Sequence, residues 1–214
     1  MRSKQIEVYK ETLKLSRKQR SIIVGTLLGD GHFETQNKGK TYRLKIEHSS
    51  KQSFYTDWLY DQFLQWVNTP PKTKPKLLGN KCLQNYGFQT LSVGQFRFYA
   101  NQFYDKGIKH VPRRIAKWLD PLALAVWFMD DGSSKSKYHK ALILNTHSFS
   151  KSDINLLRKA FEDRYSIEST IRKQSDGLQI LIVGINAEKF YKIIQPYMLP
   201  DFNYKFGALV NTIA

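Results

Sequence analysis

An internal repeat is the feature that most constrains the fold of this chain. The segment "IVGTLLGDG" (23–31) is mostly apolar and ends on Gly-Asp-Gly, and "LAVWFMDDG" (124–132) ends on Asp-Asp-Gly. Aligned on their last aspartates, Asp30 and Asp131, the segments lie 101 residues apart (131 − 30), close to half of the 214-residue chain. Such self-similarity predicts a duplicated domain.

The segments downstream of each motif also correspond. "EHSSKQSFYTDWLYDQF" is echoed by "NTHSFSKSDINLLRKAF", and "FYDKGIKHVP" by "KIIQPYMLP". In each half the pattern predicts an apolar helix, two strands, a helix, two strands and a closing helix. We therefore expect an α+β fold of two pseudo-symmetric αββαββα halves, 1–116 and 117–214. Each half would be a four-stranded antiparallel sheet with helices on one face, and the motif helices would pack at the interface.

Local signals predict where the motif helices begin and which strand face is buried. Ser16 is a suitable N-cap for the first helix, and Asp120 followed by Pro121 suits the start of the second. The segment "TYRLKIEH" (41–48) alternates between apolar and polar residues, as a half-buried strand does. Its apolar face holds Tyr42, Leu44 and Ile46, and its polar face holds Thr41, Arg43, Lys45 and Glu47.

The charge of the chain points to a polyanionic partner. Thirty-four Lys and Arg against 18 Asp and Glu give a net charge of +16. Neutralising phosphates releases counterions and favours binding, so double-stranded DNA is the expected partner. An anionic membrane face or a merely soluble basic surface are the alternatives. The basic residues alternate with apolar ones along several strands, which favours polar sheets lying along a DNA groove.

Other counts exclude several classes of protein. No apolar run reaches the ~18 residues of a membrane span, and no apolar signal-peptide core is present. The single cysteine, Cys82, allows no intramolecular disulfide and suits a reducing compartment. We expect an intracellular protein of an organelle (mitochondrion or chloroplast) or of the prokaryotic cytoplasm.

The motif aspartates are unusual because each follows an apolar helix. A helix C-terminus carries negative partial charge, which disfavours a carboxylate there. If the two helices pack side by side, Asp30 and Asp131 meet, and like charges raise a pKa. A bound divalent cation removes this cost, and carboxylates with exposed carbonyls suit Mg²⁺. Metal, carboxylates and lysines together can hydrolyse a phosphodiester. The alternative is that both aspartates are turn residues before glycine.

The two motifs resemble the signatures of a single-chain LAGLIDADG homing endonuclease. The omega-type mitochondrial intron endonuclease is similar through "WFMDDG", "LNTHSF" and "PYMLPDFNYK". Gly25 matches the central glycine of the first motif, whereas Val126 replaces it in the second, which we expect to loosen the contact between the helices. The resemblance implies a working monomer that cuts both strands of a long asymmetric target across the minor groove.

The resemblance also implies roles for particular residues. Asp30 and Asp131 would ligate the metal with the backbone carbonyls of Gly29 and Asp130, and the Asp130 side chain would turn away or contact solvent near the cut. Lys109 and Lys205 would position water or stabilise developing charge, with phosphate contact as the alternative and Lys117 as a competitor to Lys109. Mg²⁺ would be the cofactor, with Mn²⁺ as a substitute and Ca²⁺ supporting binding only.

Polar residues on and beside the predicted strands are the expected DNA contacts. They are His32, Glu34, Gln36, Thr41, Arg43, Lys45, Glu47, Lys74, Lys76, Asn85, Gln89, Lys137, Lys140, Asn145, Thr170, Arg172 and Gln174.

Two other functions compete with the nuclease. An intron maturase would use the same scaffold to bind intron RNA, and a transcription factor would use it to bind DNA without cutting. The aspartate pair favours cleavage over both, although maturase activity could accompany it.

Overall fold

The protein is described by a computed structural model that covers residues 3–79, 81–136 and 138–212. These residues form two compact units. The first comprises residues 1–20 and 30–101, and the second comprises residues 21–29 and 102–214. Most of the first motif helix therefore clusters with the second unit. None of the described helices has both the length and the apolar character needed to cross a membrane.

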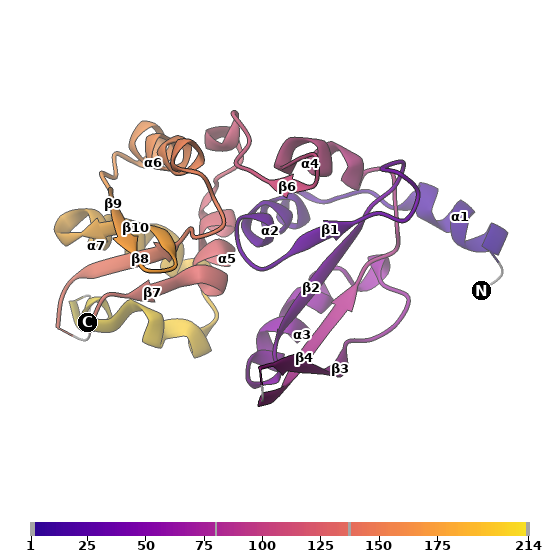
Figure 1. Ribbon diagram of the computed structural model, residues 1–214, viewed down its shortest axis with the longest axis horizontal. Helices are drawn as coiled ribbons and strands as arrows, with labels where there is room; N and C mark the ends of the chain where they lie inside the picture. The colour runs from indigo at the N-terminus through magenta and orange to yellow at the C-terminus, as the bar shows by residue number, and fades with distance from the viewer. Residues whose placement is uncertain (1–2, 80, 137, 213–214) are drawn as a thin grey trace. The chain divides into compact units, whose positions relative to one another are not determined.

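Each unit contains the predicted four-stranded antiparallel sheet (Figure 1). The first has the strand order β1-β2-β4-β3, and the second has the equivalent order β7-β8-β10-β9. The strands of the first sheet are β1 (His32–Glu34), β2 (Arg43–Ser49), β3 (Lys72–Leu78) and β4 (Lys81–Gln89). Those of the second are β7 (Gly132–Ser134), β8 (Ala141–Asn145), β9 (Thr170–Gln174) and β10 (Gly177–Val183). The shared strand order confirms the predicted duplication.

The predicted helices are present, with additions at both ends of the chain. The predicted ones are α2 (Arg17–Leu28), α3 (Ser53–Gln62), α4 (Phe96–Phe103), α5 (Pro121–Asp131), α6 (Lys151–Tyr165) and α7 (Gly184–Ile194). The additions are α1 (Ser3–Thr12) and a long 3-10 segment, η5 (Pro200–Thr212). Shorter elements are η1 (Ser50–Gln52), η2 (Leu64–Trp66), η3 (Ile115–Lys117), η4 (Gln195–Tyr197) and a small hairpin, β5 (Tyr104–Asp105) with β6 (Ile108–Lys109).

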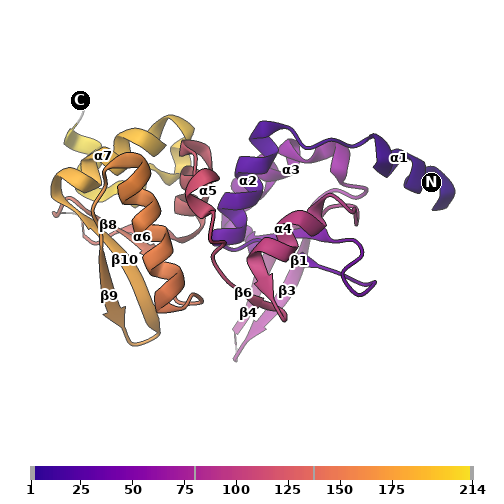
Figure 2. The ribbon, with the colours of Figure 1, turned by 90° about the horizontal axis from the view of Figure 1, so that it is seen from above.

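The helices cover one face of each sheet. In the first unit α3 packs on β2 and β4 (Figure 1). In the second α6 and α7 pack on β10, and Figure 2 shows α6 lying alongside β10. Strand β2 buries alternate residues, so Leu44 and Ile46 face the core while Arg43, Lys45 and Glu47 lie on the opposite, half-exposed face. This confirms the face assignment made from the alternation in "TYRLKIEH" for the residues of β2, whereas Tyr42, just before the strand, is half-buried.

The motif helices begin where the capping signals place them. The Ser16 hydroxyl accepts from the Gln19 backbone N–H at 3.1 Å, and the Gln19 side chain accepts from the Ser16 N–H at 2.9 Å. These reciprocal bonds form a capping box. At the start of α5, Asp120 accepts from the Ala123 N–H at 2.9 Å, with Pro121 in the first turn. Both predicted starts are confirmed.

Candidate functional site

The two motif helices pack against each other within the second unit. Every residue of α2 from Ser21 to Leu28 and every residue of α5 from Ala123 to Met129 is buried. A Cβ at Gly25 would lie 2.6 Å from the carbonyl oxygen of Ala123 and 2.6 Å from the Val126 Cβ. The expectation that Val126 loosens this contact is therefore wrong. The missing side chain of Gly25 leaves the space that the Val126 side chain occupies.

The contact continues to the C-terminal ends of the two helices. A Cβ at Gly29 would lie 2.3 Å from Oδ2 of Asp130. The Asp130 side chain thus points toward the end of α2, which corrects the expectation that it turns away, and it is partly exposed to solvent. The close helix packing leaves it against Gly29, where only a residue without a side chain fits. Asp131 is the last residue of α5 and is half-buried.

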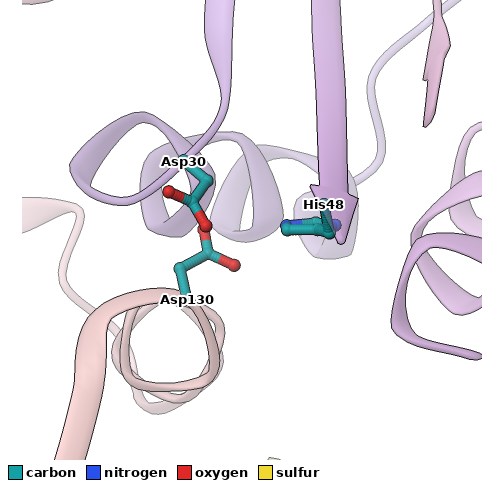
Figure 3. A group of neighbouring side chains, drawn as sticks. All are labelled: Asp30, His48 and Asp130. Carbon is teal, nitrogen blue, oxygen red and sulfur yellow. The ribbon is translucent and has the colours of Figure 1, made fainter. Parts of the chain in front are cut away.

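In the first unit, Asp30 follows Gly29 directly and lies near His48 at the end of β2. A carboxylate oxygen of Asp30 and a ring nitrogen of His48 lie within 4.8 Å of each other (Figure 3). Asp30 is exposed, whereas His48 is buried with 5% of its surface accessible. A carboxylate and an imidazole at this separation can share one divalent ion. Asp130, also drawn in Figure 3, belongs to the second unit.

Two lysines lie at the C-terminal ends of the motif helices, both within the second unit. The ammonium group of Lys109 donates to the Gly29 carbonyl at 3.0 Å. That of Lys205 donates to the carbonyls of Phe128, Met129 and Asp130 at 3.4, 2.5 and 3.2 Å. A cation is favoured at the negative end of a helix dipole. Lys117, by contrast, lies exposed in η3.

This arrangement places positive charge beside the carbonyls that the resemblance implies as metal ligands. Lys205 is only 7% exposed, so its charge acts in a region with little water to screen it. A buried cation close to a reacting phosphate can stabilise negative charge that develops during hydrolysis. Each motif helix thus ends on a carboxylate-bearing turn with a lysine bound to its last carbonyls.

The predicted contacts of the first half gather on one face of their sheet. The register pairs His32 with Lys45, Glu34 with Arg43 and Lys74 with Asn85, and directly paired residues share a face. The members of this polar face are His32, Glu34, Arg43, Lys45, Glu47, Lys74, Lys76, Asn85 and Gln89. Gln36 and Thr41 lie in the loop between β1 and β2.

Glu34 organises the basic residues of this face. Its carboxylate accepts from Arg43 at 2.7 and 3.0 Å and from Lys45 at 3.3 Å. Burial raises the pKa of Glu34, but the hydrogen bonds and charges of Arg43 and Lys45 outweigh it and hold the pKa below its usual 4.5. Arg43 is therefore held in a fixed orientation, as base recognition requires.

The second sheet presents fewer polar groups. Asn145, Thr170, Arg172 and Gln174 share its outer face, which also contains the apolar Ile143 and Leu181. Lys140 immediately precedes β8 and forms an ion pair with Glu188 of α7 at 2.7 Å, so its side chain is directed toward that helix. Lys137 lies outside the described residues.

Two polar residues were not predicted from the sequence: Gln179 lies on the outer face of the second sheet, and His48 lies near Asp30. Gln179 sits between Asn145 and Arg172 in the register and donates to Asn145 at 2.7 Å. It was hidden because "LQILIVG" reads as an apolar strand. His48 continues the apolar face of "TYRLKIEH", and a histidine in that position was the available signal.

Comparison with known proteins identifies the family to which the chain belongs. Residues 20–190 match the model of the LAGLIDADG DNA endonuclease family. The chain belongs to this family. It is therefore a DNA endonuclease by family, a hydrolase, as the paired motifs predicted.

Relatives in this family have different names and different roles. The chain is 30% identical over 210 residues to the DNA endonuclease I-ChuI of Chlamydomonas applanata, covering 90% of this chain and 96% of that protein. It is 32% identical over 200 residues to the cytochrome b mRNA maturase bI2 of Saccharomyces cerevisiae. That match covers 87% of this chain and 47% of the maturase, so the chain spans about half the length of that relative.

A solved structure confirms the fold over nearly the whole chain. The homing endonuclease I-WcaI, bound to its DNA recognition sequence, superposes with a TM-score of 0.88 at 25% identity. The match covers 96% of this chain and 93% of that one. The α+β architecture with two four-stranded antiparallel sheets is thus that of LAGLIDADG endonucleases.

Proposed function

We propose that this chain is a site-specific endonuclease that makes a double-strand break in a long asymmetric DNA target. It hydrolyses one phosphodiester in each strand across the minor groove and works as a monomer. The observation that carries the proposal is the packing of α2 on α5, with Lys109 and Lys205 bound at the ends of the two helices. Each motif helix thus presents a lysine at its C-terminal end, and two such ends suit an enzyme that cuts two phosphodiesters, one in each strand.

The catalytic residues in this proposal are Asp30, Asp131, Lys109 and Lys205. Asp30 and Asp131, with the carbonyls of Gly29 and Asp130, would hold Mg²⁺, for which Mn²⁺ would substitute. When bound, the metal would activate a water molecule and stabilise negative charge that develops on the phosphate. The lysines hold their ammonium groups at fixed places beside these ligands and stabilise the charge that develops on the phosphate.

Binding and recognition are assigned to the sheets. The lysines and arginines of the polar faces contact phosphates and bases, so affinity falls steeply as salt rises. Because the first face is strongly basic and the second contains Ile143 and Leu181, the two halves read unlike half-sites. The target is therefore asymmetric. The proposed compartment is an organelle or the prokaryotic cytoplasm.

Selection from a random DNA library tests this function. The intact chain is incubated with Mg²⁺ and a plasmid library, and the ends of linearised molecules are sequenced. The proposal expects a single long asymmetric motif, cut in both strands. Nicks at random positions, or no linear product at any salt concentration, would contradict it.

A maturase function is the second candidate, favoured by the 32% identity to the yeast cytochrome b mRNA maturase. If the chain is a maturase, it should bind particular intron RNAs tightly and accelerate their splicing in vitro. If the chain promotes splicing and the library selection yields no cleaved site, the maturase replaces the nuclease as the function.

A further inference from the structure

The imidazole of His48 is held rigidly beside the proposed metal carboxylate Asp30. His48 is buried at the end of β2, and its Nδ1 lies 2.9 Å from the hydroxyl of Thr56, which is completely buried in α3. The ring also packs against Tyr55, with centroids 4.8 Å apart. The side chain is thus fixed by a hydrogen bond on one edge and an aromatic contact on its face.

The Thr56 contact engages one of the two ring nitrogens of His48. A histidine that ligates through one ring nitrogen usually donates its other N–H to a neighbouring oxygen, which fixes the tautomer. If Nδ1 keeps its contact with the Thr56 hydroxyl, the nitrogen that would bind an ion is Nε2. The Asp30 carboxylate could bind the same ion, because one of its oxygens lies within 4.8 Å of a ring nitrogen of His48.

The second unit has no imidazole in the corresponding position among its described residues. On β2, His48 follows Leu44 and Ile46 on the core-facing side. In the second half Leu142 and Leu144 are followed in the same way by Thr146, whose hydroxyl donates to the Leu178 carbonyl at 2.7 Å. The two halves therefore offer different ligands at the same point of the fold.

We propose that His48 is a nitrogen ligand of the divalent ion held by Asp30. The inference rests on the proposed metal role of Asp30 and goes beyond it by adding a protein nitrogen to an oxygen site. Imidazole is a weak partner for Mg²⁺ and a good one for transition metals such as Co²⁺ and Ni²⁺. An ion bound by Asp30 and His48 therefore prefers transition metals more strongly than an ion bound by oxygen ligands alone.

Electron spin-echo spectroscopy of Mn²⁺ bound to the intact chain tests this directly. With Mn²⁺ below one equivalent, the proposal expects echo modulation from a coordinated ¹⁴N. Labelling the histidines with ¹⁵N should convert it to the ¹⁵N pattern. His48→Gln should abolish the modulation, while His139→Gln should keep it, because His139 lies in an exposed loop and bonds to Ser136. Circular dichroism melting checks that each variant is folded.

A second variant keeps the test valid if His48→Gln does not fold. Thr56→Val leaves the imidazole in place but removes the oxygen that holds it, so Mn²⁺ affinity should fall by about tenfold or more while the nitrogen signal persists. The Co²⁺ affinity of His48→Gln should fall by a larger factor than its Mg²⁺ affinity. Both results are binding measurements that do not depend on turnover.

Three results would overturn the proposal. They are Mn²⁺ binding without nitrogen modulation, modulation that persists in His48→Gln, and absence of Mn²⁺ binding to the intact chain. If the first or second occurs while the wild type still cuts DNA, His48 is not a ligand and the proposed nuclease function stands. If the wild type makes no cut, the proposed function fails independently.

Discussion

Replacing Gly25 by alanine tests the close packing of the motif helices. Alanine is favoured over glycine inside a helix by about 1 kcal/mol, so propensity alone predicts a more stable protein. The structure predicts the opposite. The new Cβ would lie 2.6 Å from the Ala123 carbonyl oxygen, a backbone atom that cannot rotate away, and 2.6 Å from the Val126 Cβ.

The size of the effect follows from these contacts. Ordinary van der Waals contact begins at 3.4 Å, so α2 and α5 must separate by most of the difference from 2.6 Å. Forcing an extra methyl into a packed core costs about 1–3 kcal/mol. Because the nearest atom is a backbone oxygen, the cost should lie near the upper end of this range, about 3 kcal/mol. After the propensity gain of about 1 kcal/mol, Gly25→Ala should lower the free energy of unfolding by about 2 kcal/mol and reduce cleavage, because the helix ends carry the proposed site.

Guanidinium unfolding followed by circular dichroism measures this difference. Gly94→Ala is the matched control, because a Cβ there meets nothing within 4 Å. Val126→Ala removes the Cγ1 contact at 2.8 Å but keeps the Cβ of residue 126 and the Ala123 carbonyl, so in that background the cost of Gly25→Ala should shrink only partly. A Gly25→Ala protein that is more stable than wild type by about 1 kcal/mol would refute the packing argument.

Three further predictions concern the sheet and the helix ends. Arg43→Ala should weaken binding to the selected target by about 1–3 kcal/mol and relax specificity at one base position. Lys159→Ala, on the exposed side of α6, should not relax it, as a binding titration against single-base variants would show. Glu34 has a lowered pKa in the folded protein, so its stabilising effect is present above its usual pKa of 4.5 and is lost as the pH falls through the folded value. Glu34→Gln should therefore remove part of the acid-induced loss in melting temperature, and an unchanged acid profile would contradict this. Lys205→Met leaves three backbone carbonyls without the buried ammonium group that donates to them. It should lower the free energy of unfolding by about 1–3 kcal/mol and reduce the rate of DNA cleavage with Mg²⁺. Cleavage at the wild-type rate by a folded Lys205→Met protein would exclude a catalytic role for Lys205.

The sequence was most informative where a local pattern determines the structure. The paired motifs, the capping residues Ser16 and Asp120, and the alternation in "TYRLKIEH" predicted the duplication, the helix starts and the buried strand face. These features depend on neighbours in sequence, so they could be predicted without the tertiary fold.

Features that depend on packing between distant segments could not be predicted in the same way. The direction of the Asp130 side chain and the close fit of Val126 over Gly25 follow from how α2 meets α5. The choice of Lys109 over Lys117 depends on which lysine the chain brings to the Gly29 carbonyl. The 1–116 and 117–214 boundary, the metal ligands and the DNA contacts remain predictions that mutagenesis must test.

We propose that Asp30 and Asp131 act together in one composite catalytic centre. Cleavage of the selected duplex, labelled on both strands, by wild type, Asp30→Asn and Asp131→Asn with Mg²⁺ tests this proposal. Wild type should cut both strands, neither variant should make a double-strand break, and both variants should still bind the duplex. A double-strand break made at the wild-type rate by either variant would contradict it.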